Sequence, residues 1–289
     1  MIKLATHRLR ISDPEQSLLF YQQKLGMELI EQIQEKQCCR FFLGFDSGAD
    51  QPAALLELIH DRSDLALSVA PQPSRTEGYW KISIAVDNLD MARQRLLTNQ
   101  VSVGDAFEVP NVAYLCHLAD PDGYCIELIQ RSFRINTPDV ALKQNLPLGS
   151  HPTFLLSTIR VKDPKASLEF YRNILGMRLL SRQQVSDRQM TLYFLAFTEE
   201  RLPVPDIEAV ENREWLWKRQ YTQLELQHIW GTENQDEFTY RTDQEGGFGG
   251  LTFEVPDAHQ LDTLINMFGG PLLADPDGYR LYLQSADLD

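Results

Sequence analysis

One lysine lies in a strand-like segment where a charged side chain is costly to bury. Trp80–Ile84 alternates between polar and apolar positions, so Lys81 should share a face with Ser83 and lie opposite Ile82 and Ile84. If this face turns inward, we expect a carboxylate within salt-bridge reach of Lys81, because an unpaired buried ammonium is strongly unfavourable. A paired ammonium of this kind offers a donor to an anionic ligand. The alternative is a frayed strand with Lys81 in solvent.

The four cysteines do not form a metal-binding pattern. Adjacent Cys38 and Cys39 would point to opposite faces of a strand, so they cannot hold one ion together. Cys116 and Cys125 flank a tight turn and can face each other across a hairpin, although a bridge there would close a short loop. We favour four reduced thiols in a cytoplasmic protein.

Composition indicates a globular protein that does not bind polyanions. The 289 residues are 43% hydrophobic and 24% charged, and the length allows two domains, each with its own core. The net charge of −14 argues against nucleic acid and anionic membranes as partners, because both would be repelled. Met1–Arg10 lacks the apolar core of a signal peptide, and no apolar run is long enough to span a bilayer.

An internal repeat organises the chain. Asp13–Met27 returns as Asp163–Met177, displaced by 150 positions, with nine identities in register. Each copy begins with Asp-Pro, which suits a helix N-cap and first turn, and ends with a Gly that suits a helix C-terminus. The spacing predicts a helix over Pro14–Leu25, with a strand before it and another after it.

The repeat defines two domains and a linker. We predict a first repeat at 1–134, a linker at 135–152 and a second repeat at 153–289. Each repeat contains two strand–helix–strands units, and the last unit is shortened. Val86 and Asp120 are 34 positions apart, whereas the corresponding Val255 and Asp275 are 20 apart, so 14 residues are missing.

These motifs carry a family resemblance over nearly the whole chain. The chain resembles the vicinal oxygen chelate superfamily (glyoxalase I, bleomycin resistance proteins and dioxygenases), and most closely its glyoxalase I branch. The matching segments are Leu9–Ile11, Asp13–Met27, Leu56–Leu58, Asp120–Tyr124, Ile126–Leu128, Arg160–Pro164, Leu192–Ala196, Leu224–Leu226, His228, Trp230–Glu233 and Gly247–Gly249. The resemblance implies an α+β fold, in which four βαβββ units in two tandem repeats form two curved mixed β-sheets flanked by helices.

The resemblance also implies a divalent cation, but this chain has lost most of its ligands. The family chelates an enediolate with the metal, and a ligand Glu moves the proton. The eight ligand positions hold Thr6, Glu57, Lys81 and Glu127 in the first repeat and Leu156, Glu225, Gly250 and Tyr282 in the second. Three are Glu and none is His.

The pairing of units does not restore a ligand set. Pairing across repeats, as in glyoxalase I, groups Thr6, Glu57, Gly250 and Tyr282, and separately Leu156, Glu225, Lys81 and Glu127. Pairing within a repeat, as in extradiol dioxygenases, groups the four positions of each repeat instead. No set contains an imidazole or more than two carboxylates. We therefore expect no cofactor, or zinc or nickel on Glu57, Glu127 and Glu225 if the family chemistry survives.

No histidine replaces the missing ligands. His7 is one residue from a ligand position, and a shift of one residue turns a strand side chain to the other face. It would serve as a ligand only if the strand bulged. His60, His117 and His228 lie in strand patterns without a Cys or His partner at ligand spacing, so we interpret them as core or surface residues.

Several residues remain candidates for binding or catalysis. By resemblance, Arg10 and Arg160 stand where the family holds the carboxylates of glutathione, although a surface Arg paired with a carboxylate explains either equally well. Lys81 is a further candidate for substrate binding. Glu127 and Glu225 would be the catalytic carboxylates of any surviving reaction.

We favour a metal-free small-molecule-binding member of the family, with a glutathione or thiol adduct as one possible ligand. The alternative is an active metal-dependent glyoxalase I-type lyase that isomerises a glutathione hemithioacetal. A third reading is a structural subunit with vestigial clefts. Two fused repeats resemble an internal dimer, which predicts that a single chain suffices as a monomer.

Overall fold

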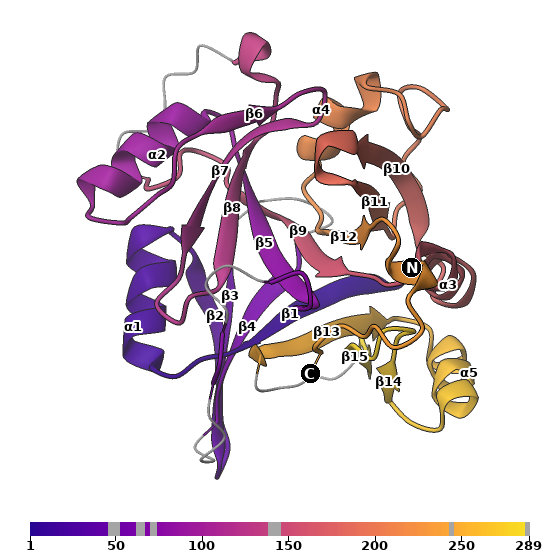
Figure 1. The fold of residues 1–289 in the computed structure, drawn as a ribbon. Helices are drawn as coiled ribbons and strands as arrows, with labels where there is room; N and C mark the ends of the chain where they lie inside the picture. The colour runs from indigo at the N-terminus through magenta and orange to yellow at the C-terminus, as the bar shows by residue number, and fades with distance from the viewer. Residues whose placement is uncertain (46–52, 62–66, 70–73, 138–145, 243–245, 287–289) are drawn as a thin grey trace.

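The strands of the computed structural model form two mixed sheets, with helices on their outer faces (Figure 1). The structure describes residues 1–45, 53–61, 67–69, 74–137, 146–242 and 246–286. The middle of the expected linker, 138–145, therefore lies outside the described residues. None of the described helices has the length and apolar character needed to cross a membrane.

The first sheet has seven strands in the order β14-β15-β13-β1-β4-β3-β2. In chain order its strands are β1 (Lys3–Arg10), β2 (Glu28–Gln34), β3 (Cys38–Gly44), β4 (Leu55–Asp61), β13 (Phe248–Val255), β14 (Leu272–Ala274) and β15 (Arg280–Ser285).

The second sheet has eight strands in the order β10-β11-β12-β9-β5-β8-β7-β6. In chain order these are β5 (Tyr79–Val86), β6 (Phe107–Val109), β7 (Ala113–Ala119), β8 (Cys125–Gln130), β9 (Thr153–Arg160), β10 (Arg178–Val185), β11 (Met190–Ala196) and β12 (Gln223–Ile229). The α+β class and the two curved mixed sheets expected from the sequence are confirmed.

The units pair across the repeats. Strand β1 of the first repeat pairs antiparallel with β13 of the second, and β5 pairs antiparallel with β9. Each sheet therefore contains one unit from each repeat, which resolves the alternative that the sequence left open.

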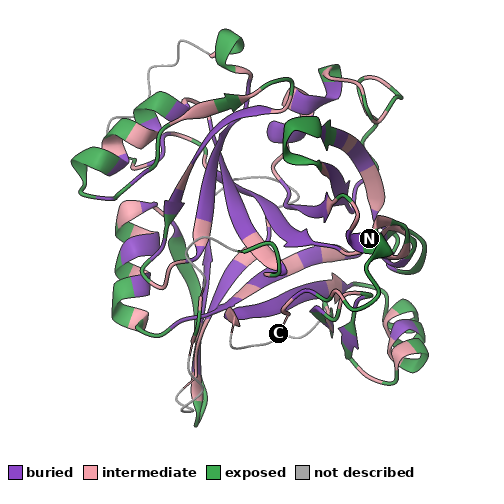
Figure 2. Ribbon diagram, viewed as in Figure 1, coloured by how far each residue is buried: buried purple, intermediate pink, exposed green. Residues whose placement is uncertain are grey.

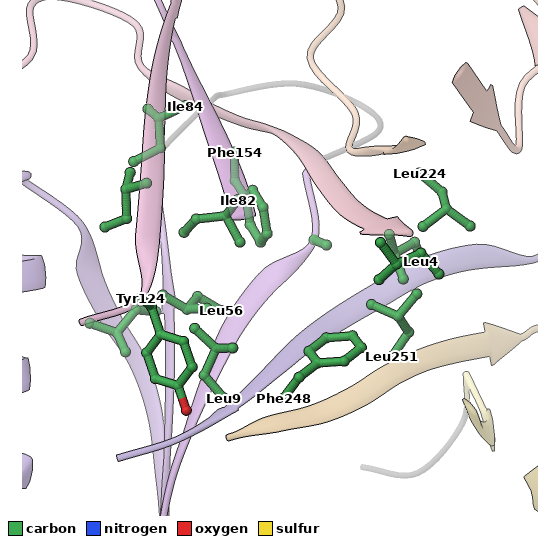
Figure 3. Close-up of a cluster of buried hydrophobic side chains, with 14 of the residues drawn as sticks. Leu4, Leu9, Leu56, Ile82, Ile84, Tyr124, Phe154, Leu224, Phe248 and Leu251 are labelled. Atoms are coloured by element: carbon green, nitrogen blue, oxygen red, sulfur yellow. The ribbon is translucent and has the colours of Figure 1, made fainter. Parts of the chain in front are cut away.

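The repeats share one main core, although the length of the chain would allow a separate core for each. Its buried side chains come from both halves of the chain, as Leu9, Ile82, Phe154 and Leu251 illustrate (Figure 3). The reason is the cross-repeat pairing, which makes both inner sheet faces composite. Figure 2 shows this buried interior against the exposed outer faces of the helices.

The repeated helix begins as expected but changes its winding. Helix α1 (Pro14–Leu18) is N-capped by Asp13, which accepts hydrogen bonds from the backbone N–H groups of Glu15 and Gln16 at 2.9 and 3.2 Å. It continues as a π-helix over Leu19–Lys24, where the sequence predicted uninterrupted α-helix. Its second copy behaves alike, as α3 (Pro164–Leu168) followed by a π-helix at Glu169–Ile174.

The remaining helices include α2 (Leu89–Thr98), α4 (Glu211–Trp217) and α5 (Ala258–Phe268). Short 3-10 turns lie at Arg134–Asn136, Ser186–Arg188 and Thr232–Asn234. The last unit contains only β13, α5, β14 and β15, consistent with its missing 14 residues.

The free thiols are not paired across the β7–β8 hairpin. Its register places Cys116 opposite Leu128 and Cys125 opposite Ala119. The two cysteines therefore do not face each other, and all four cysteines are free.

Each Asp-Pro-Asp-Gly-Tyr turn holds a buried carboxyl group. Asp120 accepts hydrogen bonds from the Tyr21 hydroxyl at 2.8 Å and from the Tyr124 N–H at 2.8 Å. The Tyr124 hydroxyl in turn donates to the Arg10 carbonyl at 2.6 Å. The second turn repeats this arrangement, with Tyr171 donating to Asp275 at 2.8 Å. The turn thereby joins the helix of one unit to the hairpin of the next.

We predict that these aspartates make the protein less stable as the pH rises from about 4 to 7. Burial raises the pKa of Asp120, and likewise of Asp275, from 3.8 to about 7. The neutral form therefore stabilises the fold below pH 4, and that contribution is lost as the pH rises through 7. Asp120→Asn mimics the neutral form, so its urea midpoint should fall less between pH 5 and pH 8 than the wild-type midpoint.

His7 acts in the opposite direction, because burial lowers its pKa from 6.5 to about 3. His7 is present in both wild type and Asp120→Asn. The difference between their pH-dependent shifts in urea midpoint therefore reports on Asp120 alone. Asp105→Asn is the control, because the Asp105 side chain is fully exposed. Equal shifts in wild type and Asp120→Asn would contradict this account.

Candidate binding cavity

A cavity of about 250 Å³ lies against the eight-stranded sheet. Along β9, Leu156, Thr158 and Arg160 follow at alternate positions, beside Gln223, Glu225 and Gln227 of β12. The polar row at Thr158 and Glu225 therefore lies between Leu156 on one side and Arg160 on the other. Leu115, Ile129, Leu156, Phe194 and Trp217 contribute to the apolar part of the lining.

Helix α4 covers part of this apolar wall. It lies within 198–221, a segment between β11 and β12 that is an insertion relative to the first repeat. The helix buries Trp217, whose indole N–H donates to the Val112 carbonyl at 3.0 Å. The ring of Trp217 meets Phe194 edge to face, with centroids 5.2 Å apart. Trp215 instead packs under the Arg219 guanidinium, 4.4 Å from the ring centroid.

Lys81 lies at the centre of the polar row. Its ammonium is 2.8 Å from Glu127 Oε1 and 3.1 Å from Glu225 Oε2. It also donates to Ser83 Oγ at 3.1 Å. Only 4% of Lys81 is exposed. The predicted carboxylate partner is therefore confirmed, and the frayed-strand alternative is wrong.

The fold produces this cluster from three strands. Lys81 and Ser83 share one face of β5, while Ile82 and Ile84 enter the core from the other. Glu127 comes from β8, which pairs parallel with β5, so it lies beside Ser83 in the register. Glu225 reaches the cluster from the other repeat, because β5 pairs with β9 and β9 pairs with β12.

The three ionised groups support one another. Burial alone would lower the pKa of Lys81, but the charges of Glu127 and Glu225 outweigh it and raise that pKa. Burial alone would raise the pKa of Glu127, but Lys81 and His117 outweigh it and lower that pKa. Lys81 and Glu127 are therefore both charged at neutral pH.

His117 completes the hydrogen bonding of Glu127, and sequence reasoning missed it. Its Nε2 lies 3.1 Å from Glu127 Oε2, while Ser83 donates to Glu127 Oε1 at 2.8 Å. A usable signal was the hairpin turn at Asp120–Tyr124, because a two-stranded register counted from it places His117 opposite Glu127. Thr158 was also missed, and it donates to Glu225 Oε2 at 2.7 Å.

Arginines lie at another part of the lining. Arg75, Arg160 and Arg188 contribute to it, and none of them forms an ion pair with a described carboxylate. Arg160 stacks on Trp80, 4.8 Å from the ring centroid, and donates through Nε to Gln227 at 3.0 Å. Arg10 is buried at the corresponding position of the seven-stranded sheet and does not line this cavity.

The equivalent centre of the seven-stranded sheet holds a different cation. Glu57 is buried and accepts a hydrogen bond from Thr6 at 3.1 Å. Arg8 Nε lies 3.0 Å from Glu57 Oε2, and Arg40 Nη1 lies 3.5 Å from Oε1. The Arg8 guanidinium also covers the Tyr282 ring at 3.9 Å. Sequence reasoning missed Arg8, although strand alternation places it on the same face as Thr6.

His7 lies away from both centres. Its Nδ1 is 2.8 Å from Ser157 Oγ, and its ring contacts those of Tyr79, Phe154 and Phe248. It is fully buried among these aromatic rings. Across the parts of the chain that the structure describes, no group of three or more His, Cys, Asp or Glu side chains is placed to hold a metal ion.

The comparisons with known proteins agree with the fold. The sequence profile of the Glyoxalase/Bleomycin resistance protein/Dioxygenase superfamily matches residues 3–128 and 151–283. Glyoxalase I of Saccharomyces cerevisiae is 28% identical, over 94% of this chain and 89% of the relative. Lactoylglutathione lyase of Schizosaccharomyces pombe is also 28% identical, over 96% and 94%. The chain is thus glyoxalase I-like in sequence over nearly its whole length.

Solved structures extend the likeness of the fold. The crystal structure of glyoxalase I from Zea mays matches with a TM-score of 0.69 at 19% identity, over 98% of this chain and 92% of that one. A dioxygenase-like protein of Bacillus subtilis matches with a TM-score of 0.62 at 12% identity, over 99% and 85%.

We predict that Lys81→Met destabilises the protein by roughly 3–5 kcal/mol at pH 7, because it leaves two buried carboxylates unpaired. Urea unfolding measures this loss. Adding Glu225→Gln should recover part of it, since one uncompensated charge disappears. Lys3→Met is the control, because Lys3 forms a half-exposed pair with Glu254 at 2.7 Å and should contribute only about 0–1 kcal/mol. A Lys81→Met protein as stable as wild type would show that the cluster is not a buried ion network.

Proposed function

Because the chain belongs to the Glyoxalase/Bleomycin resistance protein/Dioxygenase superfamily, we propose that it is a glyoxalase I-like member that binds a small molecule without a metal ion. The binding site would be the cavity of the eight-stranded sheet. The observation that carries this proposal is the Lys81 ammonium, which lies 2.8 and 3.1 Å from Glu127 and Glu225, the two carboxylates at the four ligand positions of this cavity.

The residues present do not fit a divalent cation. In the cavity, Lys81 supplies the positive charge that a metal would bring, and the fourth ligand position holds apolar Leu156. In the other centre, Arg8 pairs with Glu57. Gly250 there has φ of +107°, and a Cβ at this position would clash with the Arg280 carbonyl. No ligand side chain fits at that position without a change of backbone.

The electrostatics of the cavity favour binding over proton transfer. A carboxylate whose pKa is held low is a weak general base at neutral pH, and Glu127 is in this state. The polar row and the arginines would orient a bound small molecule, and the apolar wall would bury its apolar part. This combination of an apolar pocket with a few placed polar groups is typical of small-molecule sites.

The competing function is a metal-dependent glyoxalase I-type lyase acting on a glutathione hemithioacetal. The specific support for it is the identity of 28% with relatives named glyoxalase I and lactoylglutathione lyase, over nearly the full chain. Such a reaction would need Glu127 and Glu225, the carboxylates that share one cavity here. A glutathione or thiol adduct remains a candidate ligand under either function. With a net charge of −14, we propose neither nucleic acid nor a membrane as a partner.

We predict less than one divalent ion per chain after purification without chelator, as measured by elemental analysis. The same preparation should show no turnover of methylglyoxal and glutathione above background, with or without added nickel or zinc. A stoichiometric metal, or a metal-dependent rate that Glu127→Gln abolishes, would establish the lyase instead.

Removing the ammonium should create a metal site. The double variant Lys81→His, Leu156→Gln would surround the cavity with one imidazole, one amide and two carboxylates, a set that suits zinc or nickel. We predict that it gains about one ion per chain by elemental analysis, while Leu156→Gln alone does not. A double variant that folds but stays metal-free would argue against Lys81 as the substitute for the cation.

A further inference from the structure

The Lys81 ammonium has no donor left for a ligand. It carries three N–H groups, and Glu127, Glu225 and Ser83 accept at 2.8, 3.1 and 3.1 Å. A fourth oxygen, Thr158 Oγ1, lies at 3.4 Å. The ammonium is therefore saturated by the protein, and a ligand in the cavity has to find its polar contacts elsewhere.

One oxygen of a buried glutamate that lines the cavity has no hydrogen-bond partner within the described part of the chain. Glu225 is 3% exposed and lines the cavity, and both of its hydrogen-bond donors, Lys81 and Thr158, use Oε2. Its Oε1 remains an acceptor. Lys81, Glu127 and Glu225 together carry a net charge of −1. This part of the cavity therefore favours a hydroxyl or an ammonium, and it disfavours a second anion.

Arg160 carries a buried, positively charged hydrogen-bond donor. It lies two residues along β9 from Thr158, which stands opposite Glu225. Arg160 is 6% exposed, and its Nε and Nη1 donate to Gln227 and to the carbonyls of Ser74 and Glu77. Its Nη2 has no hydrogen-bond partner among the described residues. The neighbouring Glu77 carboxylate pairs with Arg241 at 3.3 Å instead. A buried cation without a carboxylate partner is costly, and a ligand anion would offset that cost.

The backbone positions of these two groups are close enough for one small molecule to contact both. Gln227 stands beside Arg160 in the β9–β12 register, and Glu225 is two residues further along β12, roughly 7 Å away at about 3.3 Å per residue. The cavity itself has a volume of about 250 Å³. Beyond Glu225 the lining is apolar, with Leu156, Phe194 and Trp217.

We propose that the ligand is a small apolar carboxylic acid with a hydroxyl or ammonium on the carbon next to the carboxylate. The carboxylate binds Arg160, the hydroxyl or ammonium donates to Glu225 Oε1, and the apolar side chain lies towards Phe194 and Trp217. This inference rests on the proposed function, because it requires a metal-free cavity, and it names the class of ligand.

Four phenyl-substituted three-carbon acids test the proposal by isothermal titration calorimetry at pH 7. 3-Phenyllactate and phenylalanine carry the donor, as a hydroxyl and an ammonium. 3-Phenylpropanoate lacks it, and phenylpyruvate replaces it with an acceptor. We expect phenyllactate or phenylalanine to bind at least about tenfold more tightly than the other two. The tighter of the two identifies the donor. Phenylpropanoate binding as tightly as both donor acids, or binding by none of the four, would overturn the proposal.

Variants separate the two contacts. Arg160→Gln should abolish binding of all four acids, whereas Glu225→Gln should weaken binding of the tighter donor acid, most strongly if that acid is phenylalanine. Glu57→Gln is the matched control, since Glu57 is also a buried, ion-paired glutamate but lies outside the cavity; it should bind as wild type does. If Glu225→Gln fails to fold, Glu225→Asp keeps the charge and withdraws the oxygen. Its affinity for the donor acids should fall to that for phenylpropanoate, and an unchanged preference would overturn the proposal.

The same preparation distinguishes this inference from the proposed function. A metal-free protein without glyoxalase turnover that binds none of the acids contradicts the ligand class and leaves the proposed function standing. A stoichiometric metal ion contradicts both.

Discussion

A buried ammonium between two carboxylates depends on how the whole chain is assembled. Lys81 and Glu127 belong to the first repeat and Glu225 to the second, so the cluster exists only when β5 and β9 pair in their observed register. Each of these groups would be strongly unfavourable alone in the interior. Their mutual neutralisation therefore favours one pairing of the repeats over the alternatives. We infer that the ion cluster specifies which units pair, in addition to stabilising the fold.

Each sheet buries a glutamate at its centre, Glu57 or Glu225, and the two sheets compensate its charge with different cations. Each keeps the glutamate of its Leu-Glu-Leu strand, and each neutralises it with a cation. In the eight-stranded sheet the cation comes from the neighbouring unit, as Lys81, whereas in the seven-stranded sheet it comes from β1 itself, as Arg8. Arg8 extends from Glu57 to the ring of Tyr282, so its guanidinium lies between the side chains at two of the four ligand positions of this sheet. Lys81 is shorter and saturated by oxygen atoms, so space remains beside it.

The fold was largely predictable because its signals are local and repeated. The Asp-Pro start and Gly end fixed the helices, and strand alternation placed Lys81 and Ser83 on one face. The pairing of units was not predictable from such patterns, since it depends on contacts between strands far apart in the sequence, β1 with β13 and β5 with β9. His117 and Arg8 were missed for a related reason: their roles depend on cross-strand neighbours rather than on residues nearby in sequence.

The asymmetry between the repeats then decides which centre has room for a ligand. The backbone is nearly two-fold, down to paired turns in which Tyr21 and Tyr171 donate to Asp120 and Asp275 at 2.8 Å. The insertion at 198–221 breaks this symmetry, because it brings α4 and Trp217 against the wall of the eight-stranded sheet. An indole ring covering apolar side chains excludes water from that end, and exclusion of water strengthens every polar contact within the cavity. The insertion and Lys81 thus act together: the insertion supplies the apolar wall, and Lys81 offsets one of the two carboxylate charges in the polar row.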